Sequence, residues 1–269
     1  MKRLFLILLC IVSLLNSTIA QTKSEIKVEK FLNAQDTAKA IKTLNKHLKK
    51  NPLNEVLYLR RAKIKIIRKD YDPAMADLNS YTSIATNHHE AEFLKGSIRF
   101  RQGDYAGALD HFEKVKLEPF EEQALVYTGL AYMWLYQQTY AEVTFKKTLK
   151  KYPNSTSALY NAAVQAYRME SYEYADGLID RFLKIKPDDF DAQLTKSLIL
   201  TKREKYIESN LLLREMLKTN NLNATINYSI GVNYYHLDER DLSCDYFRRA
   251  RDLGHEAAKL SLRNYCKGR

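Results

Sequence analysis

The chain is poor in the residues that make tight turns, since its 269 residues include only 8 Gly and 5 Pro. A β-sheet protein of this length needs a turn after each short strand, and Gly and Pro supply many of those turns. Lys, Leu, Ala, Tyr and Glu are abundant instead. The composition therefore argues against a sheet-rich fold and favours helices.

Catalytic and cofactor-binding motifs are also lacking. The sequence has no Gly-rich phosphate loop, no His-Glu-x-x-His, no Cys pair at zinc spacing and no nucleophile elbow. His88 and His89 precede Glu90, but adjacent side chains point in different directions and make a poor metal site. We expect no catalytic residue, no metal site and no cofactor, and a protein that is not an enzyme. A buried polar cluster with a pocket would favour an enzyme instead.

Long apolar runs are confined to the N-terminus. Lys2 and Arg3 precede the apolar run Leu4–Leu15, and small residues follow up to Ala20. This layout predicts a signal peptide over residues 1–20. The alternative is an uncleaved anchor, although a span needs about 20 apolar residues. We expect an exported protein, periplasmic in a Gram-negative cell or else secreted.

The charge is strongly positive, with a formal net charge of +11. Outside the cytoplasm this indicates acidic partners such as anionic lipid headgroups, glycans or protein segments, and not nucleic acid. The basic residues form three clusters: Arg60, Arg61, Lys63, Lys65, Arg68 and Lys69; Lys146, Lys147, Lys150 and Lys151; and Arg248, Arg249 and Arg251. The alternative is a solvated basic helix surface with no partner.

A repeat of 34 residues, once 33, organises the chain. The repeats start near residues 21, 55, 89, 122, 156, 190 and 224. Position 20 is always small: Ala40, Ala74, Ala108, Ala141, Ala175, Ser209 and Ser243. Position 24 is always large and apolar: Leu44, Leu78, Phe112, Phe145, Ile179, Leu213 and Phe247. Position 8 is small in six repeats and Val28 in the first: Ala62, Gly96, Gly129, Ala163, Ser197 and Gly231.

The pattern predicts two amphipathic helices in each repeat, A and B, packed antiparallel. Small residues at positions 8 and 20 let the two backbones approach, and position 24 lies one turn beyond position 20 on the same face. Tyr recurs at position 17, where helix B begins, and Pro at position 32, where helix B ends.

These residues resemble the tetratricopeptide repeat family. The resemblance is carried by Gly103 to Ala108 with Phe112, by Gly129 to Tyr132 with Ala141, Phe145 and Pro153, and by Ala163, Tyr172, Ala175 and Pro187. It implies an all-α, right-handed α-solenoid of about seven helix-turn-helix repeats over residues 21–254. Residues 255–269 would then form a C-terminal capping helix and tail. The outer repeats match less well, as expected of units with one neighbour.

The resemblance implies a non-enzymatic scaffold of the cell envelope that binds a partner peptide or helix in a concave groove built from helices A. By helical spacing, positions 2, 5, 9, 12 and 13 point into that groove. They predict the following binding residues: Phe93, Phe100, Arg101, Trp134, Tyr160, Tyr167, Arg168, Tyr228 and Tyr235. The alternatives are that several of them are core residues, and that the protein docks on anionic lipid or glycan through its basic helix faces.

Two cysteines, Cys244 and Cys266, lie outside the apolar N-terminal run. If helix B of the seventh repeat and the capping helix run antiparallel about Leu253 and Gly254, Cys266 comes within one turn of the level of Cys244. A disulfide is therefore possible, and an exported compartment would permit it. The alternative is two independent buried thiols.

Overall fold

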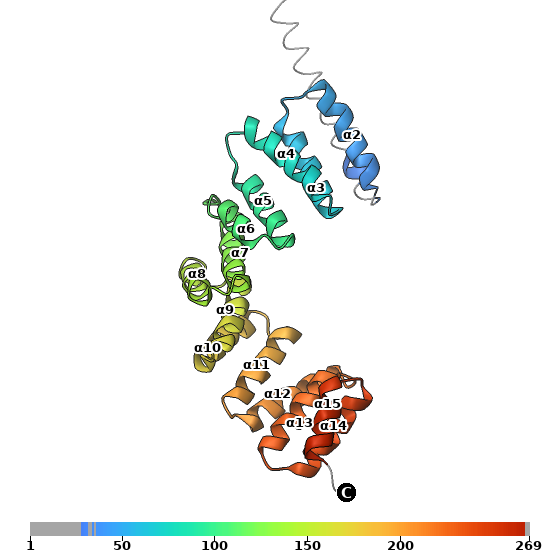
Figure 1. Ribbon diagram of the computed structural model, residues 1–269, viewed down its shortest axis with the longest axis vertical. Coiled ribbons are helices and arrows are strands. Elements are labelled where there is room, and N and C mark those ends of the chain that lie inside the picture. The colour runs from blue at the N-terminus through green and yellow to red at the C-terminus, as the bar shows by residue number, and fades with distance from the viewer. Residues whose placement is uncertain (1–27, 32–33, 35, 267–269) are drawn as a thin grey trace, which may run out of the picture. The chain divides into compact units, whose positions relative to one another are not determined.

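A computed structural model describes residues 28–31, 34 and 36–266, and every regular element in these residues is a helix (Figure 1). The expected all-α fold is thereby confirmed. The predicted signal peptide, the first repeat start at Gln21 and the tail 267–269 lie outside the described residues. None of the helices in this described part is long and apolar enough to cross a membrane.

The chain divides into two compact units, residues 1–124 and 125–269. The helices of the first unit are α2 (Thr37–Lys50), α3 (Glu55–Ile67), α4 (Tyr71–Ile84), α5 (His89–Arg101) and α6 (Tyr105–Phe112). Within this unit each helix packs on the next one along the chain. Helix α7 (Glu121–Trp134) begins in the first unit and ends in the second.

The second unit continues with further antiparallel pairs. Its helices are α8 (Gln138–Lys151), α9 (Thr156–Arg168), α10 (Tyr172–Ile185), α11 (Phe190–Lys202), α12 (Tyr206–Thr219), α13 (Ala224–His236), α14 (Arg240–Asp252) and α15 (Glu256–Tyr265). Helix α15 packs on α14, at the place expected for a cap on the last repeat.

The helix starts follow the 34-residue period. Helices α3, α5, α9, α11 and α13 begin at 55, 89, 156, 190 and 224, and α7 begins one residue before 122. Helices α4, α6, α10 and α12 each begin at the Tyr of position 17. Side chains also cap several A helices: Asn54, Ser155, Asp189 and Asn223 each accept a hydrogen bond from the backbone N–H three residues on.

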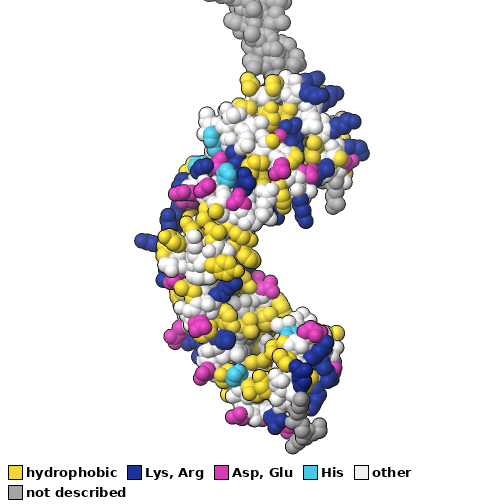
Figure 2. All heavy atoms as spheres, in the orientation of Figure 1, with side chains coloured by type: hydrophobic (Ala, Val, Ile, Leu, Met, Phe, Trp, Pro, Cys, Tyr) yellow, Lys and Arg dark blue, Asp and Glu magenta, His cyan; other side chains and the backbone are white. Residues whose placement is uncertain are grey.

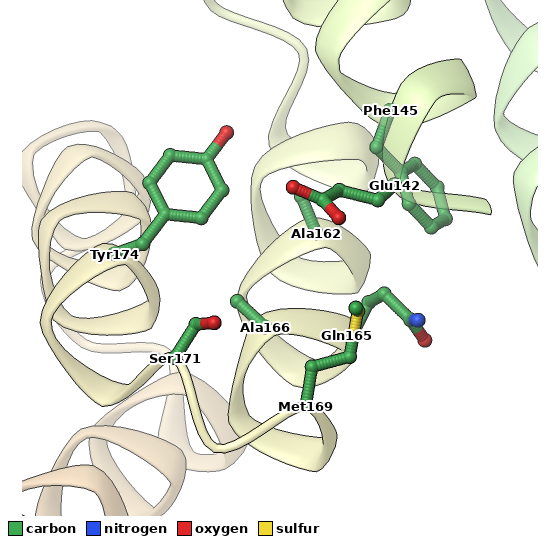
Figure 3. A pocket seen from close by; sticks show the side chains of 8 residues that line it. All are labelled: Glu142, Phe145, Ala162, Gln165, Ala166, Met169, Ser171 and Tyr174. Atoms are coloured by element: carbon green, nitrogen blue, oxygen red, sulfur yellow. The ribbon is translucent and has the colours of Figure 1, made fainter. Parts of the chain in front are cut away.

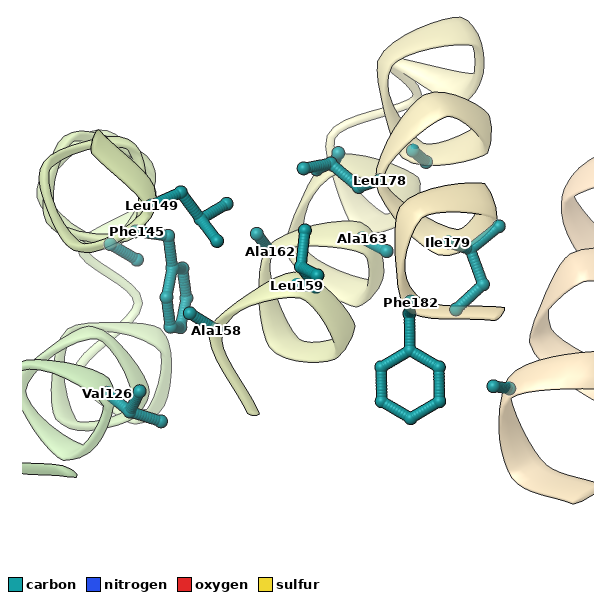
Figure 4. Packing of buried hydrophobic residues seen from close by; sticks show 14 of the residues in the cluster. Val126, Phe145, Leu149, Ala158, Leu159, Ala162, Ala163, Leu178, Ile179 and Phe182 are labelled. Atoms are coloured by element: carbon teal, nitrogen blue, oxygen red, sulfur yellow. The ribbon is translucent and has the colours of Figure 1, made fainter. Parts of the chain in front are cut away.

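The small residues lie where the packing rule requires them. Every position-20 residue from Ala40 to Ser243 is buried, and so is every position-24 residue from Leu44 to Phe247. Around them lie the apolar cores. In the second unit, Phe145 and Leu149 of α8 turn toward Ala158 and Ala162 of α9 (Figure 4). Close helix contact thus follows from the absence of bulky side chains at the crossings.

The turn between helices A and B has the same backbone conformation in each of six repeats. Its position-15 residue has a positive φ: Lys69 (65°), Gly103 (81°), Tyr136 (58°), Glu170 (59°), Glu204 (60°) and Asp238 (59°). Only one of the six is Gly, so the Gly content of the sequence gave no signal of this recurring left-handed residue. The conformation costs a residue with a Cβ about 1 kcal/mol or more.

Candidate functional site

A pocket of about 520 Å³ opens in the second unit on the helices α9, α11 and α13. It is lined by Tyr167, Leu198, Thr201, Lys202, Glu204, Tyr206, Thr225, Tyr228, Ser229, Val232 and His236. All except Glu204 and Tyr206 come from A helices, because side chains spaced three and four residues apart share one face of a helix. The pocket is within the size range of ligand sites in proteins.

The aromatic walls of this pocket are held in place by stacking. Tyr206 at the start of α12 stacks on His236 at the end of α13, with ring centroids 4.9 Å apart and an interplanar angle of 4°. Tyr228 stacks on His255, with centroids 4.2 Å apart, and also contacts Phe247. Rings fixed in this way present contact area without losing further side-chain freedom on binding.

Beneath the pocket lies a buried polar network centred on Asn233 of α13. The Asn233 side chain is fully buried; its Nδ2 donates to Ser209 Oγ and to Asn210 Oδ1, both at 2.9 Å. Its Oδ1 accepts from Thr201 Oγ1 at 2.7 Å, and Thr201 also lines the pocket. A fully paired buried network joins α11, α12 and α13 in one arrangement. The network therefore fixes Thr201 in the lining of the pocket. It contains no titratable side chain, so it supplies no general acid or base of the kind that a buried polar cluster in an enzyme would provide.

The predicted groove residues of the second unit occupy three different settings. Tyr167 and Tyr228 line the pocket. Tyr160 is half-buried and packs on Phe182, with centroids 5.8 Å apart. Three others lie outside its lining, at the surface: Trp134 (58% exposed), Arg168, and Tyr235, which packs on Tyr265.

The three predicted residues of the first unit have separate settings. Phe93 lies half-buried between Phe112 and Phe120, with centroids 6.1 and 5.7 Å away. Phe100 packs edge-on against Tyr105, and Arg101 is exposed at the end of α5. Their role in binding stays a prediction.

Several lining residues were not among the predicted ones. Tyr206 recurs at position 17 and was interpreted as the start of helix B, yet its ring forms a wall of the pocket. Lys202, at position 13, is the last residue of α11, and only Glu204 comes from the turn after this helix, to which no groove position was assigned. For Tyr206 the available signal was the recurrence of Tyr at position 17 in four repeats.

A second hollow lies between α8, α9 and α10, lined by residues that include Glu142, Gln165, Met169 and Tyr174 (Figure 3). Its volume is about 10 Å³, room for about one water molecule. It therefore offers no site for a larger ligand.

Buried carboxylates pair with cationic side chains in both units. In the first unit Glu92 contacts Lys95 at 3.3 Å and His111 Nδ1 at 2.8 Å. Burial raises the pKa of Glu92, but the hydrogen bond with His111 and the charge of Lys95 outweigh it and lower the pKa to about 2. In the second unit Asp176 pairs with Lys196 and Arg203. In the described part of the chain no group of His, Cys, Asp and Glu is arranged to hold a metal ion.

Cys244 of α14 and Cys266, which directly follows α15, are joined by a disulfide with their Cα atoms 5.8 Å apart. Of the two alternatives left open by the sequence, the structure has the bonded one. The bond ties the capping helix to the last repeat.

Comparisons with known proteins agree with this architecture. The family model "Tetratricopeptide repeat" matches residues 123–155. The C-terminal part of a TPR repeat-containing protein from Cytophaga hutchinsonii is similar, with a TM-score of 0.71 and 16% identity, covering 88% of this chain and 98% of that one. A tetratricopeptide repeat protein from Parabacteroides merdae gives a TM-score of 0.63 and 19% identity, covering 90% and 96%.

Two further similar proteins carry names that state a role. PilW, described as a type IV pilus biogenesis factor, gives a TM-score of 0.62 and 21% identity, covering 72% of this chain and 92% of that one. DnaJ homolog subfamily C member 3 from Gallus gallus is 24% identical over 244 residues, which are 87% of this chain. The match spans 43% of that relative's length.

Proposed function

Because this chain is a tetratricopeptide-repeat protein, we propose that it is a non-enzymatic scaffold that binds a peptide or helix of a partner protein along α9, α11 and α13. The observation that carries the proposal is the pocket with stacked aromatic walls and a lining residue, Thr201, that is fixed by hydrogen bonds. Aromatic side chains in preorganised pockets are what interaction hot spots use. The pocket also offers exposed polar side chains, Lys202 and Glu204, to a bound chain.

We also propose that the protein binds its partner in the cell envelope, because the sequence predicts a signal peptide. PilW, described as a type IV pilus biogenesis factor, shares the fold of this chain, and that description applies to PilW alone.

Docking through the three basic clusters is the weaker alternative, because most of their side chains are neutralised locally. In α3, Arg61 and Lys65 pair with Asp77, and Lys63 pairs with Glu90. In α8, Lys146 pairs with Glu142. In α14, Arg248 and Arg251 pair with Asp245 and Asp252. We therefore base no second function on these clusters.

Photocrosslinking in cells tests the groove proposal. A photoreactive amino acid replaces Leu198, which lines the pocket and is 39% exposed, or Leu211 on α12, which is 65% exposed and outside the lining. We expect one defined segment of a partner protein to crosslink at Leu198 and not at Leu211. Equal crosslinking at both positions, or crosslinking at Leu211 alone, would contradict the proposal.

A further inference from the structure

Helix α2 carries a charge pattern that none of the three basic clusters includes. Its 14 residues contain the five lysines Lys39, Lys42, Lys46, Lys49 and Lys50 and no Asp or Glu. All five are exposed. Figure 2 shows Lys and Arg side chains gathered where α2 lies in Figure 1.

The five lysines form one stripe. They are spaced by three, four, three and one residues, so at about 100° per residue they occupy an arc of about 100° on the helix. The buried residues Ala40, Leu44 and Leu48 occupy the opposite side. From Lys39 to Lys50 the stripe is about 16 Å long at 1.5 Å per residue. It is a straight cationic edge, and we call it the α2 lysine stripe.

The α2 lysine stripe is almost free of local neutralisation. Lys39 pairs with Asp36, the residue that caps the helix. For Lys42, Lys46, Lys49 and Lys50, no carboxylate lies within ion-pair distance in the described residues. This distinguishes α2 from α3, where every cation, Arg60, Arg61, Lys63 and Lys65, has a carboxylate partner. Lys49 and Lys50 lie in the last turn, where cations stabilise a helix, but Lys42 and Lys46 lie too far from that end for this explanation.

We propose that the α2 lysine stripe docks the protein on the surface of a bilayer that contains anionic lipid. Four to eight cations on one face of an amphipathic helix match a layer of anionic headgroups, with about 1 kcal/mol from each lysine near the surface. The basic side chains of this face are all lysine, without the planar arginine fork that suits bidentate recognition in nucleic-acid binding. The face also carries no large apolar side chain, so the contact is electrostatic and the helix stays on the surface without inserting.

Cosedimentation with vesicles tests this proposal independently of the groove, which lies in the other unit. The full chain is mixed with vesicles of phosphatidylcholine alone or of phosphatidylcholine and phosphatidylglycerol in equal parts. Binding to neutral vesicles measures how much the apolar run Leu4–Leu15 contributes to vesicle binding, because every variant contains this run. The variant K42Q/K46Q/K49Q is compared with K147Q/K184Q/K218Q, which removes the same charge from exposed lysines scattered over α8, α10 and α12.

We expect the α2 variant to lose at least about tenfold in partition onto anionic vesicles, and the scattered variant to lose less than about threefold. Wild-type binding to anionic vesicles should also fall steeply as salt rises. Far-UV circular dichroism of both variants should match the wild type, because only exposed side chains change. Equal losses in the two variants would overturn the proposal. So would equal binding to neutral vesicles, or tighter lysine-dependent binding to duplex DNA than to the anionic vesicles.

Discussion

Phe145 on α8 lies against Gly129 on α7, so closely that a Cβ on Gly129 would stand 2.6 Å from ring atom Cε1 of Phe145. Two other repeats have the same pair: Gly96 with Phe112, and Gly231 with Phe247, with corresponding distances of 2.6 and 2.7 Å. Where position 24 is Leu or Ile, position 8 carries a side chain: Val28 with Leu44, Ala62 with Leu78, Ala163 with Ile179, and Ser197 with Leu213. The side chains at positions 8 and 24 of a repeat therefore fill one shared space between helices A and B, so a larger residue at one position requires a smaller residue at the other.

This relationship determines whether a substitution of Gly129 in α7 stabilises or destabilises the protein. In an exposed helix, Gly→Ala stabilises by about 1 kcal/mol. Here the added methyl overlaps the Phe145 ring, and we expect Gly129→Ala to lower the free energy of unfolding by about 2 kcal/mol. Urea denaturation measures the change. Adding Phe145→Leu should recover part of the loss, since Ala with Leu is a natural pair in repeat two. Additive losses in the double variant would contradict a shared volume.

The residue with positive φ in the turn between helices A and B leads to two predictions of opposite sign for stability, one for Gly103 and one for Glu170. Gly103→Ala should cost about 1 kcal/mol, because Cβ disfavours a φ of 81°. Glu170→Gly should stabilise by about 0.5 to 1 kcal/mol, because Glu170 holds a φ of 59°. Thermal unfolding of both variants measures the two shifts. Changes of the same sign would show that the turn conformation does not decide stability there.

The disulfide between Cys244 and Cys266 should contribute to the stability of the C-terminal end. It closes a loop with a sequence separation of 22, worth about 3 kcal/mol in the chain-entropy model. Replacing both cysteines by Ser should therefore cost about that much, and a reductant should lower the stability of the wild type but not of the variant. Hydrogen exchange would locate the loss. Unchanged protection of α15 after reduction would contradict this role.

Glu92 should make the first unit sensitive to acid. Its pKa is lowered to about 2 from an ordinary value of 4.5, so its stabilisation is complete above about pH 5 and is lost as the pH falls toward 2. At pH 7, Glu92→Gln leaves buried Lys95 without its carboxylate and should cost about 2 kcal/mol.

The loss from Glu92→Gln should shrink as pH is lowered toward 2, and urea denaturation at several pH values measures it. The control is Glu215→Gln, which breaks an exposed pair with Lys218 and should change stability by less than about 0.5 kcal/mol. A Glu92→Gln loss that stays constant with pH would rule out this ion pair as the cause.

The sequence was sufficient for the repeats because their rule is local. A small residue at positions 8 and 20 and a large one at position 24 locate both helices of a repeat, and helix starts such as Tyr172 and Phe190 follow. The antiparallel geometry about Gly254 also brought Cys244 and Cys266 within reach. None of these inferences depends on which side chains of different repeats pack against one another.

The pocket could be predicted only in part, because its lining depends on contacts between repeats. Helical spacing found Tyr167 and Tyr228, but the stacking of Tyr206 on His236 and the network around Asn233 join residues 23 to 32 positions apart. Trp134 was assigned to the groove by the same spacing, yet it lies outside this pocket. The α2 lysine stripe was missed because it is dispersed along the helix and not contiguous in sequence.

The affinity of the partner segment captured at Leu198 tests the central claim most directly. It is measured by fluorescence anisotropy for the wild type, for Leu198→Asp in the pocket and for Leu211→Asp outside it, at low and high salt. We expect Leu198→Asp to weaken binding by at least about tenfold, Leu211→Asp to change it by less than about twofold, and salt to have little effect. Equal affinities for all three proteins, or binding abolished by salt alone, would contradict a partner held in the groove.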